Sequence, residues 1–163
     1  MKNFIILLLT CSALYAQTSA VALYEESQKA LSVGNIELAG EKMRAAIEAD
    51  KSNEKFRAEF DKLNNLRNKR NNANRAVQDG RFDDAIQGFG DVLQSVPNSA
   101  ESLYGTGKAY EGKKEFMTAV DFYKKSLQVD SGYDKSKKSV SNVAKKLYNS
   151  ANQDYKNGNL ESA

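Results

Sequence analysis

The chain has 163 residues, enough for one domain with a modest core, and 28% of them are charged, with a net charge of +3. A nucleic-acid-binding domain would concentrate basic charge on one face, so this mixed surface predicts no nucleic-acid partner. The sequence contains no histidine, which excludes Ser-His-Asp catalysis, Cys-His catalysis and zinc sites built on histidine and cysteine within it. We therefore expect no enzyme activity, no metal and no cofactor.

Residues 1–16 have the layout of a secretory signal peptide. Lys2 supplies positive charge, an apolar run occupies positions 4–9, and Ala16 is a small residue suited to cleavage. The apolar run is too short to span a bilayer as a helix, which takes roughly 20 apolar residues. We expect the mature chain, residues 17–163, to be exported to the periplasm or cell envelope of a bacterium, with eukaryotic secretion as an alternative.

Cys11, the only cysteine, allows a second interpretation of this leader. Bacterial lipoproteins are cleaved just before a cysteine that receives lipid, and such signals usually carry glycine, alanine or serine where this chain has Thr10. Because Thr10 fits poorly, we expect cleavage after Ala16 and a mature chain without a thiol. Membrane attachment would require lipidation at Cys11.

The same outline recurs further along the chain. The stretches 23–39, 103–119 and 147–163 each begin with Leu-Tyr and end with alanine, and Ala85 provides a further alanine of the same kind. A turn-like segment precedes each of these alanines, such as the one that contains Gly80, and glycine at such a position favours the end of a helix. Apolar residues resume at helical spacing after the first three. Each unit is therefore predicted to be a helix, a tight turn and a second helix.

The stretch 103–130 resembles a tetratricopeptide repeat (TPR). The residues that carry the large–small–aromatic pattern of the family are Leu103, Gly107, Tyr110, Phe116, Ala119 and Tyr123. Ala85 and Ala119 are 34 residues apart, which equals the period of the family. The resemblance implies an all-α fold, a right-handed α-solenoid of helix-turn-helix repeats with units of about 20–53, 54–99, 100–133 and an incomplete 134–163.

Gly107 also belongs to a Gly-Thr-Gly-Lys stretch that looks like a phosphate-binding loop. That motif needs a glycine where Ser102 stands, a serine or threonine after Lys108, and a preceding strand. We instead expect Gly107 inside a helix, in close contact with the helix that carries Ala119.

Two of the intervals between these alanines are longer than the 34-residue period of the family. Ala39 and Ala85 are 46 residues apart, and Ala119 and Ala163 are 44 apart. The excess is close to three helical turns of 3.6 residues each, which keeps an apolar face nearly in phase. Apolar residues hold helical spacing through 54–78 and again through 140–155, so two lengthened first helices are predicted. A short additional helix in each insertion is the alternative.

The last unit stops just inside its second helix, at Ala163. Stacked arrays normally end in a polar capping helix. We therefore expect the chain to be part of a longer protein.

In the TPR family the first helix of each unit lines a concave groove. The resemblance implies a binding surface made of Tyr24, Arg70, Asn74, Tyr104, Lys108, Tyr148, Asn152 and Tyr155, with Gln28, Val77 and Glu111 on the same face. Tyrosine and arginine are enriched at binding hot spots. The alternative is that the tyrosines only fill half-exposed helix junctions. The carboxylate clamp of some family members is not expected, because Gly105 and Asn149 replace two of its residues.

The lysines between positions 135 and 146 are predicted to form a solvated face, with anionic lipid or an acidic partner as the alternative. Taken together, the sequence predicts an exported scaffold for protein–protein interaction that binds a protein or peptide in its groove. One alternative is a recruiting or anchoring segment of a longer envelope enzyme or assembly factor whose active domain lies beyond Ala163. Another is self-association through the long helices.

Overall fold

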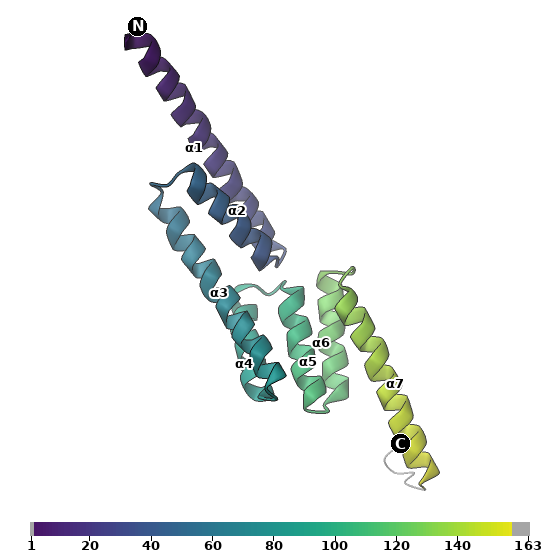
Figure 1. Ribbon diagram of the computed structural model, residues 1–163. Coiled ribbons are helices and arrows are strands. Elements are labelled where there is room, and N and C mark those ends of the chain that lie inside the picture. Colours follow the sequence, from purple (N-terminus) through teal and green to yellow (C-terminus); the bar gives the residue numbers. More distant parts are fainter. Residues whose placement is uncertain (1, 158–163) are drawn as a thin grey trace. The chain divides into compact units, whose positions relative to one another are not determined.

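The computed structural model describes the backbone of residues 2–157 and the side chains of residues 17–157. This part of the chain contains seven α-helices and no strand (Figure 1), which confirms the all-α prediction. In chain order they are α1 (Lys2–Ser32), α2 (Ile36–Ala49), α3 (Glu54–Gln78), α4 (Phe82–Ser95), α5 (Ala100–Gly112), α6 (Phe116–Val129) and α7 (Asp134–Lys156). The predictions that concern the Cys11 side chain and Ala163 lie outside the described residues. Within the described range, no helix combines the length and apolarity needed to cross a membrane.

Tight turns join α1 to α2, α3 to α4 and α5 to α6. Each turn has one residue in the left-handed conformation: Gly34 with φ 82°, Gly80 with φ 75° and Lys114 with φ 64°. Glycine adopts this conformation without a steric penalty, whereas a residue with a Cβ is strained there. The first three predicted units are therefore helix-turn-helix hairpins, and the third of them turns at a lysine where the first two use glycine. The turn predicted after α7 lies outside the described residues.

The two predicted long helices are present as single helices. α3 has 25 residues and α7 has 23, whereas α2, α4 and α6 have 14 each and α5 has 13. Asn53 caps the start of α3, since its Oδ1 accepts a hydrogen bond from the Phe56 amide at 3.3 Å. The extra residues of the long intervals thus extend first helices, and the alternative of an additional short helix is wrong.

The chain divides into two compact units, Met1–Asn68 and Lys69–Ala163, and the boundary falls inside α3. The core of the first unit is apolar. Its buried members are Ala20, Ala30, Ala39, Met43, Ala46, Phe56 and Leu63, contributed by α1, α2 and the first half of α3. The second half of α3 instead supplies Ala73 and Ala76 to a core that it shares with Ala85 and Phe89 of α4.

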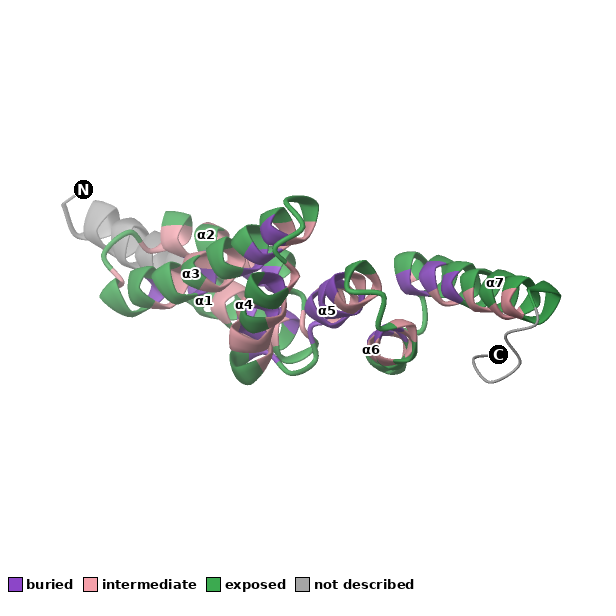
Figure 2. Ribbon diagram, turned by 90° about the horizontal axis from the view of Figure 1, so that it is seen from below, coloured by how far each residue is buried: buried purple, intermediate pink, exposed green. Residues whose placement is uncertain are grey.

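In the second unit, rings from α4 and α6 pack on glycines of α5. A Cβ added at Gly107 would lie 2.6 Å from the Tyr123 ring and 3.1 Å from the carbonyl oxygen of Ala119. A Cβ at Gly105 would collide with the Phe89 ring in the same way. These contacts confirm that Gly107 is needed for helix packing. They also leave α5 as the most buried helix of this unit (Figure 2).

Burial changes along α7. Ser136, Ser139 and Val143 in its first half are buried, whereas the second half is mostly exposed (Figure 2). Part of the contact with α6 is polar, because Ser136 Oγ donates to Ser126 Oγ at 2.9 Å. Ser126 Oγ in turn donates to the carbonyl oxygen of Ala100 at 2.9 Å. Hydrogen-bonded serines therefore occupy core positions at this junction.

Candidate protein-binding surface

The predicted binding face of the second unit follows one side of α5. Glu101, Tyr104, Lys108 and Glu111 are spaced by three or four residues, so their side chains lie on one face of the helix. All four are partly buried. Arg70 of α3 reaches this face and places a guanidinium nitrogen 2.9 Å from the Glu101 carboxylate, while its own side chain is only 4% exposed. Arg70 therefore holds Glu101 in position from a buried site.

Tyr104 is fixed by two other tyrosines. Its ring centroid lies 5.6 Å from that of Tyr123, and again 5.6 Å from that of Tyr133, which it meets edge-on. Aromatic pairs at these separations contribute roughly 0.5–1.5 kcal/mol each beyond their buried area. Burial, followed by the negative charge of Glu101, raises the pKa of Tyr133 to about 12. The Tyr133 hydroxyl is therefore neutral and able to donate a hydrogen bond at physiological pH.

Glu111 joins three helices at the other end of this face. Its carboxylate accepts hydrogen bonds from Tyr123 Oη at 2.6 Å, Lys146 Nζ at 2.7 Å and Lys108 Nζ at 3.1 Å. Burial alone would raise the pKa of Glu111, but the bonds from Lys146, Tyr123 and Lys108 outweigh it and hold that pKa at about 2. Burial and the same carboxylate raise the pKa of Tyr123 well above its usual range.

The first unit carries one residue of the predicted surface. Tyr24 of α1 stacks on Phe56 of α3 with a centroid distance of 5.1 Å, and Lys55 Nζ lies 4.8 Å from the Tyr24 centroid. Behind it, Ser27 Oγ donates to the carbonyl oxygen of Ala39 at 2.7 Å. Ser27 and Gly107 occupy equivalent repeat positions, so a hydrogen bond replaces the close glycine contact in this unit.

The last three predicted residues lie in the exposed half of α7. Tyr148 is 71% exposed and Tyr155 is 68% exposed. They are seven residues apart, which places them on nearly the same face of the helix, and Asn152 between them is also exposed. Tyrosine combines an apolar ring with a polar hydroxyl, so these two exposed side chains suit a contact surface.

The structure thus places the predicted residues in three environments. Arg70, Tyr104 and Lys108 belong to one connected side-chain cluster, with partly buried Asn74 one turn after Arg70 on α3. Tyr24 packs in the first unit, and the α7 residues face solvent. The position-equivalent Tyr24, Tyr104 and Tyr148 therefore have different surroundings, and their shared binding role stays a prediction.

Two members of the cluster were missed in the sequence. Glu101 lies one helical turn before Tyr104, so helical spacing alone could have identified it. Tyr133 lies in the connection between α6 and α7, at the repeat position that Ser99 occupies one period earlier. No repeat signal marks an aromatic residue there. The described residues include no group of three metal-binding side chains close enough together to hold an ion.

No protein-family model matches the chain, and no curated protein matches it. Among solved structures it is similar to the N-terminal domain of stress-induced protein-1 (STI-1) from C. elegans, with 19% identity, a TM-score of 0.42 and coverage of 79% of this chain and 97% of that chain. It is also similar to the TPR domain of P58(IPK), with 16% identity, a TM-score of 0.39 and coverage of 81% of this chain and 47% of that one.

The fold assignment depends on the chain's own geometry. α5 and α6 pair as helices of 13 and 14 residues, three tight turns each contain a residue with positive φ, and Gly107 lies in close contact with Tyr123 and Ala119. By these features, the chain is an all-α protein of TPR-like helix-turn-helix repeats.

Proposed function

We propose that this chain is a protein–protein interaction scaffold and that the face formed by Arg70, Tyr104 and Lys108 binds a polypeptide partner. The observation that carries the proposal is the rigidity of this face. Arg70 fixes Glu101, two tyrosines fix Tyr104, and Glu111 fixes Lys108, yet Tyr104 and Lys108 keep part of their surface exposed. A side chain that is already ordered loses little entropy when a partner binds.

The chemistry of this face suits a peptide with mixed polar and apolar groups. The Tyr104 ring offers apolar contact area, and the partly exposed Lys108 ammonium offers hydrogen bonds to a carbonyl or carboxylate. The adjacent carboxylates of Glu101 and Glu111 are already paired with cations. Such an arrangement resembles the core and rim of a protein interface.

The proposal includes export to the cell envelope. Its support is the layout of residues 1–16, a charged start, an apolar run and a small residue at the cleavage position. Mass spectrometry of the protein purified from an envelope fraction should find a mature N-terminus at Gln17. An N-terminus that begins with lipidated Cys11, or an intact Met1, would contradict this part of the proposal.

Site-specific photo-crosslinking tests the binding face directly. A photoreactive amino acid at Lys108, and separately at Asn74, should yield the same cross-linked partner in cells that produce the chain. The matched control is Lys124 on α6, an exposed lysine of the second unit, which should yield no such adduct. Purified unlabelled chain should compete the adduct away.

Tyr104→Ala in the Lys108-labelled protein should reduce the adduct at least about tenfold, since the loss of one hot-spot side chain costs about 2 kcal/mol or more. Circular dichroism must show unchanged helicity in this variant. Equal adducts from Lys108 and Lys124, or an adduct unaffected by Tyr104→Ala, would show that another surface binds the partner.

A further inference from the structure

The three helix hairpins, α1/α2, α3/α4 and α5/α6, carry different side chains at one equivalent position in the groove between their two helices. In the α5/α6 hairpin, Tyr110 and Phe122 stack across the groove between the helices with centroids 5.4 Å apart, and Lys125 Nζ lies 4.7 Å from the Phe122 centroid. One 34-residue period earlier, the equivalents of Tyr110 and Phe122 are Ala76 and Gly88. The α3/α4 hairpin therefore has no ring at the place where its neighbour has two.

The α1/α2 hairpin closes the same position with an ion pair. The equivalents of Ala76 and Gly88 there are Ala30 and Lys42. Lys42 extends from α2 toward α1, and its ammonium lies 2.5 Å from the carboxylate of Glu26. Two hairpins therefore cover this groove with their own side chains, one with stacked rings and one with a salt bridge.

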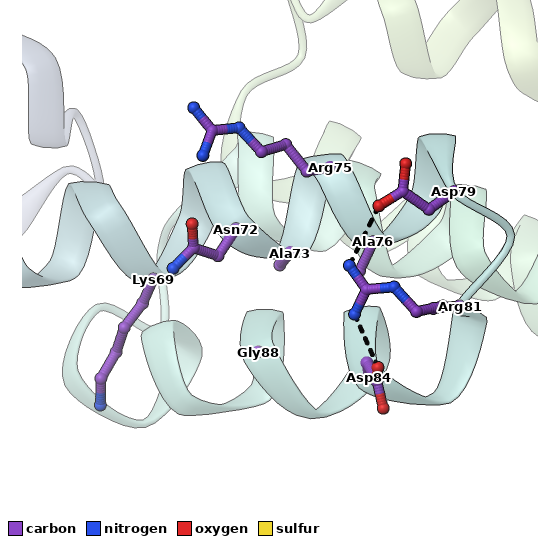
Figure 3. Close-up of a pocket in the computed structure, with 9 residues that line it drawn as sticks. All are labelled: Lys69, Asn72, Ala73, Arg75, Ala76, Asp79, Arg81, Asp84 and Gly88. Carbon is purple, nitrogen blue, oxygen red and sulfur yellow. Dashed lines mark hydrogen bonds and ion pairs between the residues drawn. The ribbon is translucent and has the colours of Figure 1, made fainter.

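In the α3/α4 hairpin the groove is open, with a volume of about 460 Å³. The two helices approach closely at Ala73 and Gly88, where a Cβ added to the glycine would be 3.0 Å from the Ala73 Cβ. Figure 3 shows Lys69 and Asn72 at one end of the groove and Arg81 with two aspartates at the other. The small residues supply the apolar floor. The Arg75 side chain lies between the two polar ends and points away from Gly88 (Figure 3).

The two ends differ in the charge that they offer. Arg81 donates hydrogen bonds to Asp79 at 3.0 Å and to Asp84 at 2.8 Å, so this end is neutralised within the chain. At the other end the Lys69 ammonium lies 3.8 Å from the nearest Asp91 oxygen, which is beyond hydrogen-bond distance. A carboxylate brought by a partner can therefore bind Lys69 without first breaking a short ion pair.

We propose that the α3/α4 groove is a second binding site, which receives an aromatic side chain of a peptide that also carries a neighbouring acidic residue. The ring takes the place that Phe122 fills in the α5/α6 hairpin, over Ala76 and Gly88. The carboxylate meets Lys69, and the Asn72 amide can hydrogen-bond to the peptide main chain. This site is separate from the face formed by Arg70, Tyr104 and Lys108, and it stands without that proposal.

The probe is the blocked tripeptide acetyl-Asp-Phe-Asp-amide, titrated into the full ¹⁵N-labelled chain and followed by amide chemical shifts. We expect saturable shifts at Ala73, Ala76 and Gly88, with a Kd on the order of 1 mM for a ligand of this size. Acetyl-Asp-Ala-Asp-amide tests the ring and acetyl-Lys-Phe-Lys-amide tests the charge. Both should bind at least about fivefold more weakly, because each lacks one of the two contacts.

A variant that covers the α3/α4 groove, called the closing variant, tests the site in the protein. Asn72→Glu with Gly88→Lys copies the pair of Glu26 and Lys42 that covers the α1/α2 hairpin. We expect it to abolish the shifts at Ala73 and Ala76. The matched control is Asn71→Glu with Gly90→Lys, which makes the same charge changes at positions outside the groove. A Cβ added at Gly90 would have no atom within 4 Å, so the control should fold normally and bind the probe unchanged.

Three results would overturn the proposal: no shifts at these amides at about ten times the expected Kd, equal binding of the phenylalanine and alanine peptides, or full binding by the closing variant. If the closing variant is misfolded, Lys69→Gln is the fallback, and it should weaken the probe about two- to fivefold. The Tyr104→Ala variant should bind the tripeptide normally. The experiments therefore distinguish a wrong proposal for the α3/α4 groove from a wrong proposal for the face formed by Arg70, Tyr104 and Lys108.

Discussion

The α3/α4 and α5/α6 hairpins are related by the 34-residue repeat, but the side chains that meet between their two helices differ in polarity. In α3/α4, Phe89 is fully buried and partly buried Val77 packs against the same cluster. One period later the same two positions hold Tyr123 and Glu111, which form a 2.6 Å hydrogen bond. The repeat therefore fixes the position and approximate size of the two side chains, while their polarity is free to change.

This difference decides how each hairpin connects to its surroundings. The apolar pair Val77 and Phe89 can only fill space. The Glu111 carboxylate instead also binds Lys108 on its own helix and Lys146 on α7. The polar version of the contact therefore ties α5, α6 and α7 together at one charged group, and it should make that part of the protein sensitive to pH.

The largest expected effect is the removal of the Phe89 ring. Phe89→Ala leaves a cavity at a fully buried position, and such changes cost about 3–5 kcal/mol of unfolding free energy. Because the cluster to which this ring belongs is apolar, the loss should be nearly equal at pH 7 and pH 3. Urea unfolding at both pH values measures it. A loss that shrinks strongly at low pH would show that the two hairpins do not differ as described.

Glu111→Gln tests the polar contact. The pKa of Glu111 falls from 4.5 to about 2 on folding, so its carboxylate stabilises the native state above pH 4.5, and this stabilisation is lost as the pH falls from 4.5 to about 2. The shift corresponds to about 3 kcal/mol. The variant should be about 2–3 kcal/mol less stable than wild type at pH 7, and the difference should disappear near pH 2.

A double variant serves as the control for this prediction. Glu111→Val with Tyr123→Phe recreates the apolar pair of α3/α4, and replacing both partners of a buried hydrogen bond by apolar groups is often nearly neutral. We expect it to recover most of the stability lost by Glu111→Gln and to show little dependence on pH in this range. A double variant as unstable as the single one would mean that the lysines need the carboxylate.

Gly107→Ala and Gly90→Ala should have opposite signs. The added Cβ at Gly107 meets the Tyr123 ring and the Ala119 carbonyl, and overpacking of this kind costs about 1–3 kcal/mol. At Gly90 in α4 the added Cβ meets nothing within 4 Å. There the higher helix propensity of alanine should stabilise the protein by up to about 1 kcal/mol. Thermal unfolding of both variants shows whether packing or helix propensity determines the effect of alanine at each position.

The smallest expected effect concerns the turns of the two hairpins. α3/α4 turns at Gly80 and α5/α6 at Lys114, both with positive φ. Lys114→Gly relieves strain of about 1–2 kcal/mol but adds flexibility to the unfolded chain. We expect a net gain of about 0.5–1 kcal/mol, measured by urea unfolding. A net loss would indicate that the Lys114 side chain makes a stabilising contact that outweighs the strain.

Much of the fold could be predicted because it depends on spacing. The apolar residues between positions 54 and 78 keep helical phase, and α3 begins and ends at these residues. Gly107 and Ala119 were identifiable because a small residue repeats wherever two helices meet closely. Lys114 was harder, since a lysine gives no local signal for a left-handed turn, and only its place in the period marked it.

The candidate site was predictable only in part. The sequence places Tyr104 and Lys108 on one helical face, but it does not show that Arg70 is buried against Glu101 or that Lys146 reaches Glu111. Both contacts join residues more than 30 positions apart, and repeat spacing predicts backbone register but no pairing of long charged side chains. The open groove at Gly88 depends on which side chains reach across each hairpin, and the repeat pattern carries no signal for that.

The boundary between the compact units falls within α3, so a single helix contributes to two separate cores. Unfolding of either core removes packing that stabilises α3. Because helices form and fray cooperatively, loss of helix in one half of α3 destabilises the helix in the other half. Any ligand that keeps residues 69–78 helical therefore also makes it costlier for residues 54–68 to unravel. We therefore expect ligand binding at residues 69–78 to slow amide hydrogen exchange in residues 54–68.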